Sequence, residues 1–222
     1  MLLQKMTRLF IVPALVTVGV SASGQNLLNN AGYEDPLGFD FSDTSNWNGF
    51  FGAPPDTILV ASNETGAPPL SGAQALELTI NGVPGVVNGT NSFTGHVQTV
   101  PGIVAGTEYT YSTNARHDGT APTGNIEFRI EWFNSGGAQI SNDQITLETS
   151  LTDVYQPFSI TAVAPAGTVS ANVVTAAATF NQDVLHDNTV FFDDTSLVVV
   201  PEPASLVLLG LGGVAMLRRR VR

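Results

Sequence analysis

Hydrophobic and polar residues alternate with a period of two along several short segments of this 222-residue chain. Ile126, Phe128, Ile130 and Trp132 point to one side of an extended segment, and charged residues lie between them. This alternation is typical of a strand with one buried face. Similar patterns predict strands at 76–80, 97–100, 109–113, 154–160, 171–176 and 190–200. No long helical pattern interrupts them, so the pattern predicts an all-β domain.

Turn-forming residues separate these segments. Asn134-Ser135-Gly136-Gly137 is typical of a hairpin turn, because glycine accepts the positive φ that such turns require. About eight to ten strands at this spacing favour an antiparallel β-sandwich or jelly roll. Residues 39–69 are rich in Pro, Gly and Asn, and we expect a long irregular stretch at one rim, where binding loops commonly lie.

The first 24 residues have the pattern of a signal peptide. Lys5 and Arg8 precede an apolar run at 9–20, and small residues at 21–24 offer a cleavage site for signal peptidase. The run is shorter than the roughly 20 residues of a stable membrane-spanning helix. A buried strand is the alternative. We expect the segment to be a removable signal helix that directs export across the inner membrane.

The last 22 residues contain three parts in order. The rigid tripeptide Pro201-Glu202-Pro203 is followed by an apolar segment at 204–217 and by a basic cluster. That cluster consists of Arg218, Arg219 and Arg220, with Arg222 at the end. Basic residues after an apolar helix stay on the cytoplasmic side, so this segment would hold the preceding domain outside.

These three parts resemble the PEP-CTERM sorting signal of Gram-negative bacteria over residues 200–222. The resemblance implies that an exosortase recognises the tail and cleaves near the tripeptide, so that the anchor is transient. Proteins with this signal are often associated with exopolysaccharide-producing species, which implies a cell-surface or extracellular location. An ordinary C-terminal anchor is the alternative.

The charge of residues 26–200 restricts the possible partners. This span contains 18 of the 19 acidic residues but only two basic ones, Arg116 and Arg129, for a formal charge of 2 − 18 = −16. Such a domain offers no cationic face to nucleic acid or to an anionic lipid surface. Neutral molecules and cations are the natural partners, unless the acidity serves only to keep the protein in solution. The chain has no Cys, which excludes disulfides and thiolate metal sites.

A second resemblance extends over most of residues 26–200. Its segments are 26–34 (NLLNNAGYE), 71–78 (SGAQALEL), 105–112 (AGTEYTYS), 164–168 (APAGT) and 192–197 (FDDTSL), with Trp47 after the first. In this order they resemble the strands of galactose-binding-like jelly rolls, especially carbohydrate-binding modules. The resemblance implies one β-sandwich domain that binds carbohydrate or exopolysaccharide without catalysis.

The same resemblance implies a structural calcium ion between the first and last strands. Glu34 ends the first of these segments and Asp193 lies in the last, with Asp194 as the substitute ligand. Carboxylate and carbonyl oxygens are the ligands that Ca²⁺ prefers. The alternative is that these carboxylates are only hydrated or hydrogen-bonded.

Aromatic residues are the candidates for glycan contact, because sugar rings stack on flat apolar surfaces. The candidates are Trp47, Phe50, Phe51, Tyr109, Tyr111 and Trp132, and a place in the core is the alternative for each of the Trp and Tyr residues. His96, His117 and His186 are scattered without zinc-type spacing, and no nucleophile motif is present, so we expect no catalytic residues. A purely structural matrix protein is the first alternative function, and an envelope polysaccharide hydrolase is the second.

Overall fold

Ten strands build the part of the chain that the structure, a computed structural model, describes: residues 24–38, 46–52, 57–64, 68–82, 92–122, 124–179 and 188–201. They are β1 (Asn48–Gly52), β2 (Thr57–Glu64), β3 (Ala75–Gly82), β4 (Ser92–Pro101), β5 (Glu108–His117), β6 (Asn125–Asn134), β7 (Gln139–Thr146), β8 (Gln156–Val163), β9 (Thr168–Thr179) and β10 (Asn188–Val199).

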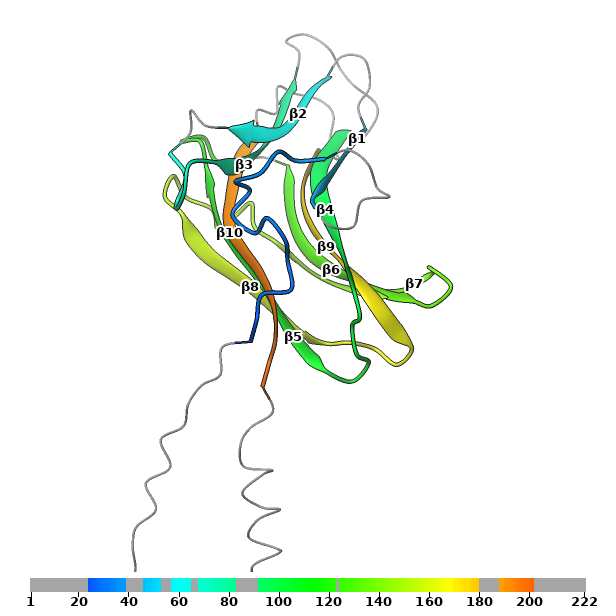
Figure 1. The fold of residues 1–222 in the computed structure, drawn as a ribbon. Helices are drawn as coiled ribbons and strands as arrows, with labels where there is room; N and C mark the ends of the chain where they lie inside the picture. The colour runs from blue at the N-terminus through cyan, green and yellow to red at the C-terminus, as the bar shows by residue number, and fades with distance from the viewer. Residues whose placement is uncertain are drawn as a thin grey trace, which may run out of the picture. The chain divides into compact units, whose positions relative to one another are not determined.

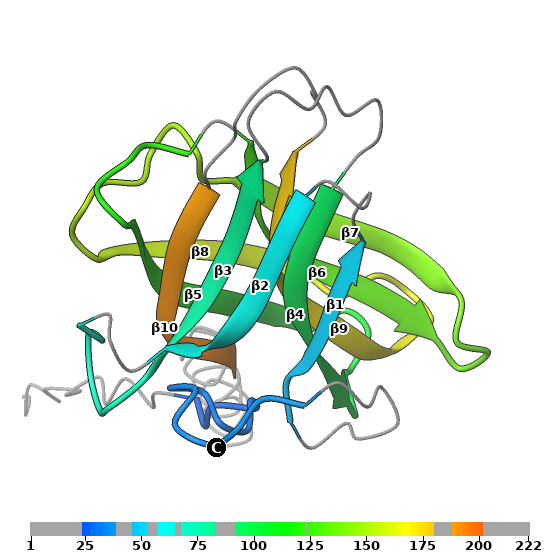
Figure 2. The ribbon, with the colours of Figure 1, turned by 90° about the horizontal axis from the view of Figure 1, so that it is seen from above.

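The strands form two five-stranded sheets, which Figures 1 and 2 show stacked against each other. One sheet has the order β1-β4-β9-β6-β7 and the other β2-β3-β10-β5-β8, and all of the strand pairs are antiparallel. Every connection except β2–β3 and β6–β7 crosses from one sheet to the other. The predicted all-β antiparallel sandwich is therefore confirmed.

Alternation along the strands builds the core. In β5 and β6, which belong to different sheets, every second residue is buried, and these rows face each other between the sheets. Tyr111 of β5 stacks on Phe128 of β6 with ring centroids 3.9 Å apart. The largest fully buried side chains are Trp47, Trp132, Tyr33, Tyr111, Phe128 and Phe192. Burial of such large apolar surfaces is the main favourable term in folding.

The hairpin between β6 and β7 has the predicted turn. Gly137 has a φ of 77°, and its N–H donates to the Asn134 carbonyl at 3.0 Å. The Asn134 side-chain oxygen also accepts hydrogen bonds from the N–H groups of Gly136 and Ala138. A left-handed backbone of this kind favours glycine, which is why the sequence pattern located the turn.

Two expectations about the first third of the chain were wrong. Residues 39–69 do not form one irregular stretch, because β1 and β2 lie within this range. Residues 26–34 do not form a strand of either sheet; within 24–38, turns and bends take its place. The Leu27 N–H donates to the Leu197 carbonyl of β10, and Asn29 exchanges two hydrogen bonds with the Gln98 side chain of β4. The segment therefore links the two sheets along one side, where it is blue in Figure 1.

The described residues contain no helix with the length and hydrophobicity that a membrane crossing requires. The expected signal peptide at 1–24 lies outside the described residues except for Gly24, and the apolar segment 204–217 lies outside them entirely. Of the sorting tripeptide, Pro201 is described and exposed, whereas Glu202, Pro203 and Arg218–Arg220 lie outside. The two predicted terminal helices stay predictions.

Candidate functional site

The outer face of the sheet β1-β4-β9-β6-β7 has small residues along its centre. Side chains on this face alternate with core residues, so Glu127, Arg129 and Glu131 of β6 point outward while Ile126 and Phe128 point inward. Three rows cross the face in strand order: Asn48–Val97–Val174–Arg129–Gln144, Phe50–Gly95–Ala176–Glu127–Thr146 and Gly52–Phe93–Ala178–Asn125. Gly and Ala in β4 and β9 leave a shallow floor between larger side chains on either side.

Phe50 and Phe93 each lie over a glycine of the neighbouring strand. Phe50 pairs with Gly95 and Phe93 pairs with Gly52 in the β1–β4 register. A Cβ atom on Gly95 would lie 2.6 Å from Cζ of Phe50, and one on Gly52 would lie 2.5 Å from Cζ of Phe93. Each ring therefore occupies the space that a side chain on its partner would need, with ring centroids 6.2 Å apart. This packing holds the two rings against the sheet.

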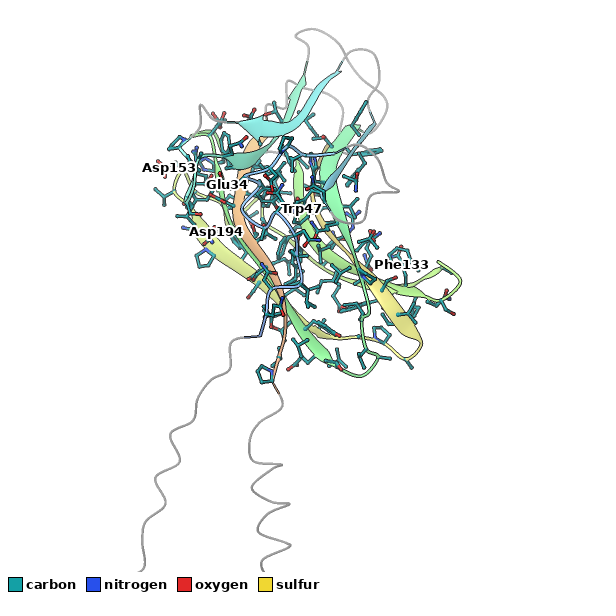
Figure 3. All side chains as sticks on the ribbon, viewed as in Figure 1. Glu34, Trp47, Phe133, Asp153 and Asp194 are labelled. Atoms are coloured by element: carbon teal, nitrogen blue, oxygen red, sulfur yellow. The ribbon has the colours of Figure 1, made fainter. Side chains whose placement is uncertain are left out.

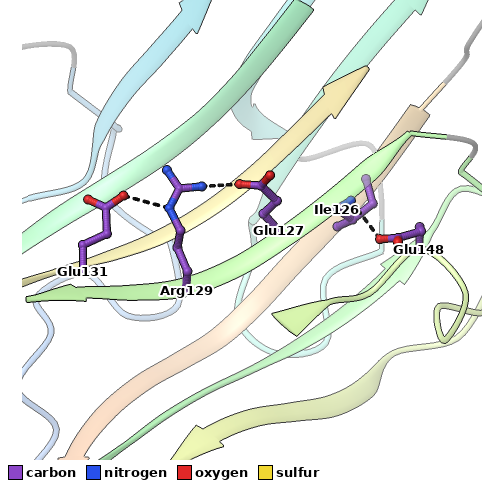
Figure 4. A network of polar contacts seen from close by, with 5 residues as sticks. All are labelled: Ile126, Glu127, Arg129, Glu131 and Glu148. Atoms are coloured by element: carbon purple, nitrogen blue, oxygen red, sulfur yellow. Dashed lines mark hydrogen bonds and ion pairs between the residues drawn. The ribbon is translucent and has the colours of Figure 1, made fainter. Parts of the chain in front are cut away.

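A triad of alternating charges lies along the outer face of β6 (Figure 4). The Arg129 guanidinium donates through Nε to Glu131 Oε1 at 2.8 Å and through Nη1 to Glu127 Oε2. The three side chains are only 20%, 13% and 16% exposed for Arg129, Glu127 and Glu131, so neighbouring atoms restrict their motion. We call these residues the acid–arginine triad.

The two rings and two residues of the triad, Glu127 and Arg129, border one hollow, which we call the groove. It has a volume of about 200 Å³ and is lined by Phe50, Phe93, Glu127, Arg129, Ala176 and Ala178. Enclosed small-molecule pockets measure roughly 300–1,000 Å³, so this is a shallow surface site. Apolar ring faces beside charged hydrogen-bonding groups are suited to a polyol such as a sugar, whose C–H face and hydroxyl edge have different requirements.

Of the six aromatic candidates, only Phe50 lines the groove. Trp47, Tyr109, Tyr111 and Trp132 are at most 2% exposed and pack in the core, so they present no ring face to solvent (Trp47 is labelled in Figure 3). Phe51 is 66% exposed, but it follows Phe50 on the opposite face of β1.

Sequence reasoning missed Phe93, Ala176 and Ala178 of the groove and all three residues of the triad, Glu127, Arg129 and Glu131. The alternation in residues 126–133 placed the three charged residues on the outer face, but it gave no reason to link them to Phe50. Only the strand order and register show that β6 and β1 contribute to one groove.

A second group of functional candidates, the carboxylate cluster, consists of Glu34, Asp193 and Asp194. A Cβ atom on Gly32 would lie 3.7 Å from Cγ of Glu34, 3.9 Å from Asp194 Oδ1 and 4.0 Å from Asp193 Oδ1. The predicted proximity of Glu34 to Asp193 and Asp194 is thus present, and Figure 3 shows Glu34 and Asp194 on the same side of the sandwich. Asp194 has a φ of 48° in a β-bulge, where the β10–β5 register shifts between Asp193 and Ser196. A bulge of this kind changes the direction of a side chain.

The cluster is hydrogen-bonded to the loop at residues 70–74. Glu34 accepts from the N–H groups of Ala73 and Gln74. Asp193 Oδ2 accepts from Leu70 N and Ser71 N at 2.8 and 3.1 Å, and the Ser71 hydroxyl donates to Asp194 Oδ1 at 2.7 Å. Burial raises the pKa of the Asp193 carboxyl, and the amide hydrogen bonds oppose this effect. The carboxylates thereby hold the loop at 70–74 to Glu34, at the end of the segment 26–34, and to β10.

The donor types of this cluster suit Ca²⁺, but their arrangement does not converge on one point. Within the described residues, no group of three or more His, Cys, Asp or Glu side chains is placed to hold a metal ion. The carboxylate oxygens face amide and hydroxyl hydrogens instead. Calcium binding by Glu34 and Asp193, with Asp194 as substitute, therefore stays a prediction.

Neither of the two described histidines lines the groove. His96 is fully buried between the sheets, and burial lowers its pKa to about 4. His117 is 9% exposed and accepts a hydrogen bond from the Gly119 N–H, while His186 lies outside the described residues. The expected lack of catalysis stays a prediction.

A protein-family model for the PEP-CTERM protein-sorting motif matches residues 199–221. The chain therefore carries this sorting motif, as its three-part C-terminus predicted. The motif implies export and a membrane-anchored C-terminal sorting signal. No curated protein matches the sequence.

Solved structures with a similar fold include carbohydrate-binding modules and parts of larger proteins. A module of family 4 has a TM-score of 0.51 at 17% identity, and the match covers 78% of this chain and 99% of the module. A xylan-binding module from Paenibacillus barcinonensis has a TM-score of 0.50 at 15% identity and covers 82% and 98%. The enzymatically active domain of tailspike protein 4 of bacteriophage CBA120 has a TM-score of 0.55 at 13% identity. That match covers 79% of this chain but only 21% of the tailspike chain. At these identities the comparisons establish the β-sandwich fold.

Proposed function

We propose that this chain is an exosortase-sorted surface or extracellular-matrix protein whose sandwich binds a polysaccharide chain in the groove without catalysis. Signal peptidase and the exosortase are its processing partners, and an exopolysaccharide or another glycan is its ligand. The sorting motif at 199–221 supports export and processing by an exosortase. The similarity to carbohydrate-binding modules supports the ligand class.

The packing of Phe50 and Phe93 over glycines is the single observation that carries the binding function. A ring packed against a glycine backbone is held in place before any ligand arrives, so binding costs less side-chain entropy. The adjacent triad supplies charged hydrogen-bonding groups for hydroxyls. A shallow, open groove suits a polymer that extends beyond the site in both directions.

The triad favours binding over hydrolysis. A glycosidase needs one carboxylic acid to donate a proton and a second carboxylate across the scissile bond. Glu127 and Glu131 instead both bind the Arg129 guanidinium, which lies between them. The envelope hydrolase is therefore the weaker candidate, and a purely structural matrix protein is the main alternative.

Affinity electrophoresis of the purified protein through gels that contain neutral polysaccharides tests the proposal. We expect retardation by at least one glycan and no release of reducing sugar from it. Unchanged mobility in every gel would leave the structural role as the better account, whereas release of sugar would establish a hydrolase.

A further inference from the structure

The acid–arginine triad leaves Arg129 a restricted set of donors. A guanidinium has two edges that can bind a carboxylate with two parallel hydrogen bonds, Nε–Nη2 and Nη1–Nη2. Glu131 occupies Nε and Glu127 occupies Nη1, so each edge has already lost one donor. Among the described residues, Nη2 has no hydrogen-bond partner, and Figure 4 shows this nitrogen without a dashed line.

The charges around Nη2 discriminate between neutral and acidic ligands. One arginine and two carboxylates give the triad a formal charge of 1 − 2 = −1 at neutral pH. Arg116, the other basic residue of 26–200, lies on β5 in the second sheet, where it stacks on Phe191 with Cζ 4.2 Å from the ring centroid. A ligand carboxylate at Nη2 would thus meet two fixed carboxylates and a strongly acidic domain without a compensating cation.

A neutral sugar avoids this charge repulsion and can form hydrogen bonds with all three residues of the triad. Each hydroxyl both donates and accepts, so it can accept from Nη2 and donate to the oxygens of Glu127 and Glu131. A ligand carboxylate can only accept, so it supplies no hydrogen to the lone pairs of Glu127 and Glu131 that Arg129 does not already fill. Buried acceptors without donors are costly, which adds to the charge repulsion.

We propose that Glu127 and Glu131 are specificity-determining residues that restrict the groove to uncharged glycans by occupying and screening Arg129. The inference rests on the proposed function, because it assigns a ligand class to the same groove. Without these two carboxylates, the same arginine beside two aromatic rings is a receptor for a uronate.

The experiment compares neutral polymers with acidic derivatives of the same backbones. The probes are dextran with carboxymethyl dextran, and hydroxyethylcellulose with carboxymethylcellulose. Binding of the full protein is measured for the wild type, the single variant Glu131→Gln and the double variant Glu127→Gln/Glu131→Gln. Glutamine keeps a carbonyl acceptor for Arg129 and removes the charge. The matched control Glu108→Gln/Asp153→Asn removes two charges from exposed positions outside the groove (Asp153 is labelled in Figure 3).

We expect the wild type to bind a neutral polymer at least about tenfold more tightly than its carboxymethyl form. The double variant should bind the carboxymethyl form at least about tenfold more tightly than the wild type does, with an affinity that falls as salt is added. Glu131→Gln should lie between the two, and melting curves should show that each variant folds.

Equal binding of both polymers by the wild type would overturn the inference and leave the proposed function intact. An unchanged preference in the double variant, or an equal gain in the control, would also overturn it. If the wild type binds no probe but the double variant binds the acidic ones, the screening role stands and the proposed function fails. If no protein binds any probe, both fail.

Discussion

Acid should destabilise the sandwich through one buried histidine. His96 lies on β4 opposite Thr175 of β9, and its side chain is 0% exposed between the two sheets. Removal from water disfavours the charged imidazolium, and this burial lowers the pKa of His96 to about 4 from the ordinary 6.5. The unfolded chain therefore takes up a proton at a higher pH than the folded protein.

The sign and the size of the effect follow from this difference. The stabilisation that His96 provides by remaining neutral is complete above pH 6.5, is lost as the pH falls from 6.5 to about 4, and changes no further below that. At about 1.4 kcal/mol per pH unit, the loss amounts to about 3 kcal/mol. Typical domains have an unfolding free energy of about 5–15 kcal/mol, so this loss is a large fraction.

The assay is urea unfolding at a series of pH values between 7.5 and 4 for the wild type and for His96→Gln. The glutamine retains a polar side chain but does not titrate, so the variant should lose much less stability over this range. Asp193 acts in the opposite direction, because a carboxyl whose folded pKa is raised gains stability as the pH falls. If the unfolding free energy falls equally with pH in both proteins, burial of His96 is not the cause of the acid sensitivity, and the reasoning is refuted.

Three further predictions concern the loop, the rings and the processing. If calcium binds at Glu34 and Asp193, chelation should lower the melting temperature, because an ion at a hundredfold excess over its Kd stabilises the fold by about 2.7 kcal/mol. Asp193→Ala should abolish this response. Identical wild-type melting curves in calcium and in chelator would exclude the site. Gly52→Ala should displace the Phe93 ring, whose side-chain atoms are the nearest to the new Cβ, and weaken glycan binding at an almost unchanged melting temperature. Gly95→Ala should lower both, because its Cβ would also lie 2.5 Å from the Thr175 carbonyl oxygen; equal binding by all three proteins would show that the rings do not contact the ligand. Mass spectrometry of the mature protein from its host should show one cleavage near residue 24 and another near the Pro-Glu-Pro motif, and an uncleaved C-terminus would contradict exosortase processing.

The sequence predicted the central strands of the fold because their alternation is strong. In β6, buried side chains alternate without interruption with partly exposed ones from Ile126 to Trp132. The sequence pattern therefore identifies both the strand and the face that it buries. Edge strands carry weaker signals: β7 is mostly exposed and polar, and β1 and β2 lie in a region rich in turn-forming residues. Chain segments at a sheet edge bury less surface, so their sequences are less constrained.

The site was less predictable than the fold, since it depends on register. The resemblance to carbohydrate-binding modules placed Glu34 near Asp193, and the structure brings them to one loop. Aromatic residue type alone did not separate Phe50 from Trp47, because both kinds of ring occur in cores and in binding sites. The pairs Phe50–Gly95 and Phe93–Gly52 can be recognised only when the register between β1 and β4 is known.

The most direct test of the central claim is isothermal titration with a neutral polysaccharide that the wild type binds. The double variant Phe50→Ala/Phe93→Ala removes both rings of the groove, and Phe51→Ala removes an exposed ring from the opposite face of the same strand. The account predicts a loss of at least about tenfold in affinity, which is about 1.4 kcal/mol, for the double variant and no change for Phe51→Ala. Unchanged affinity of the double variant, or an equal loss in Phe51→Ala, would contradict glycan binding in the groove.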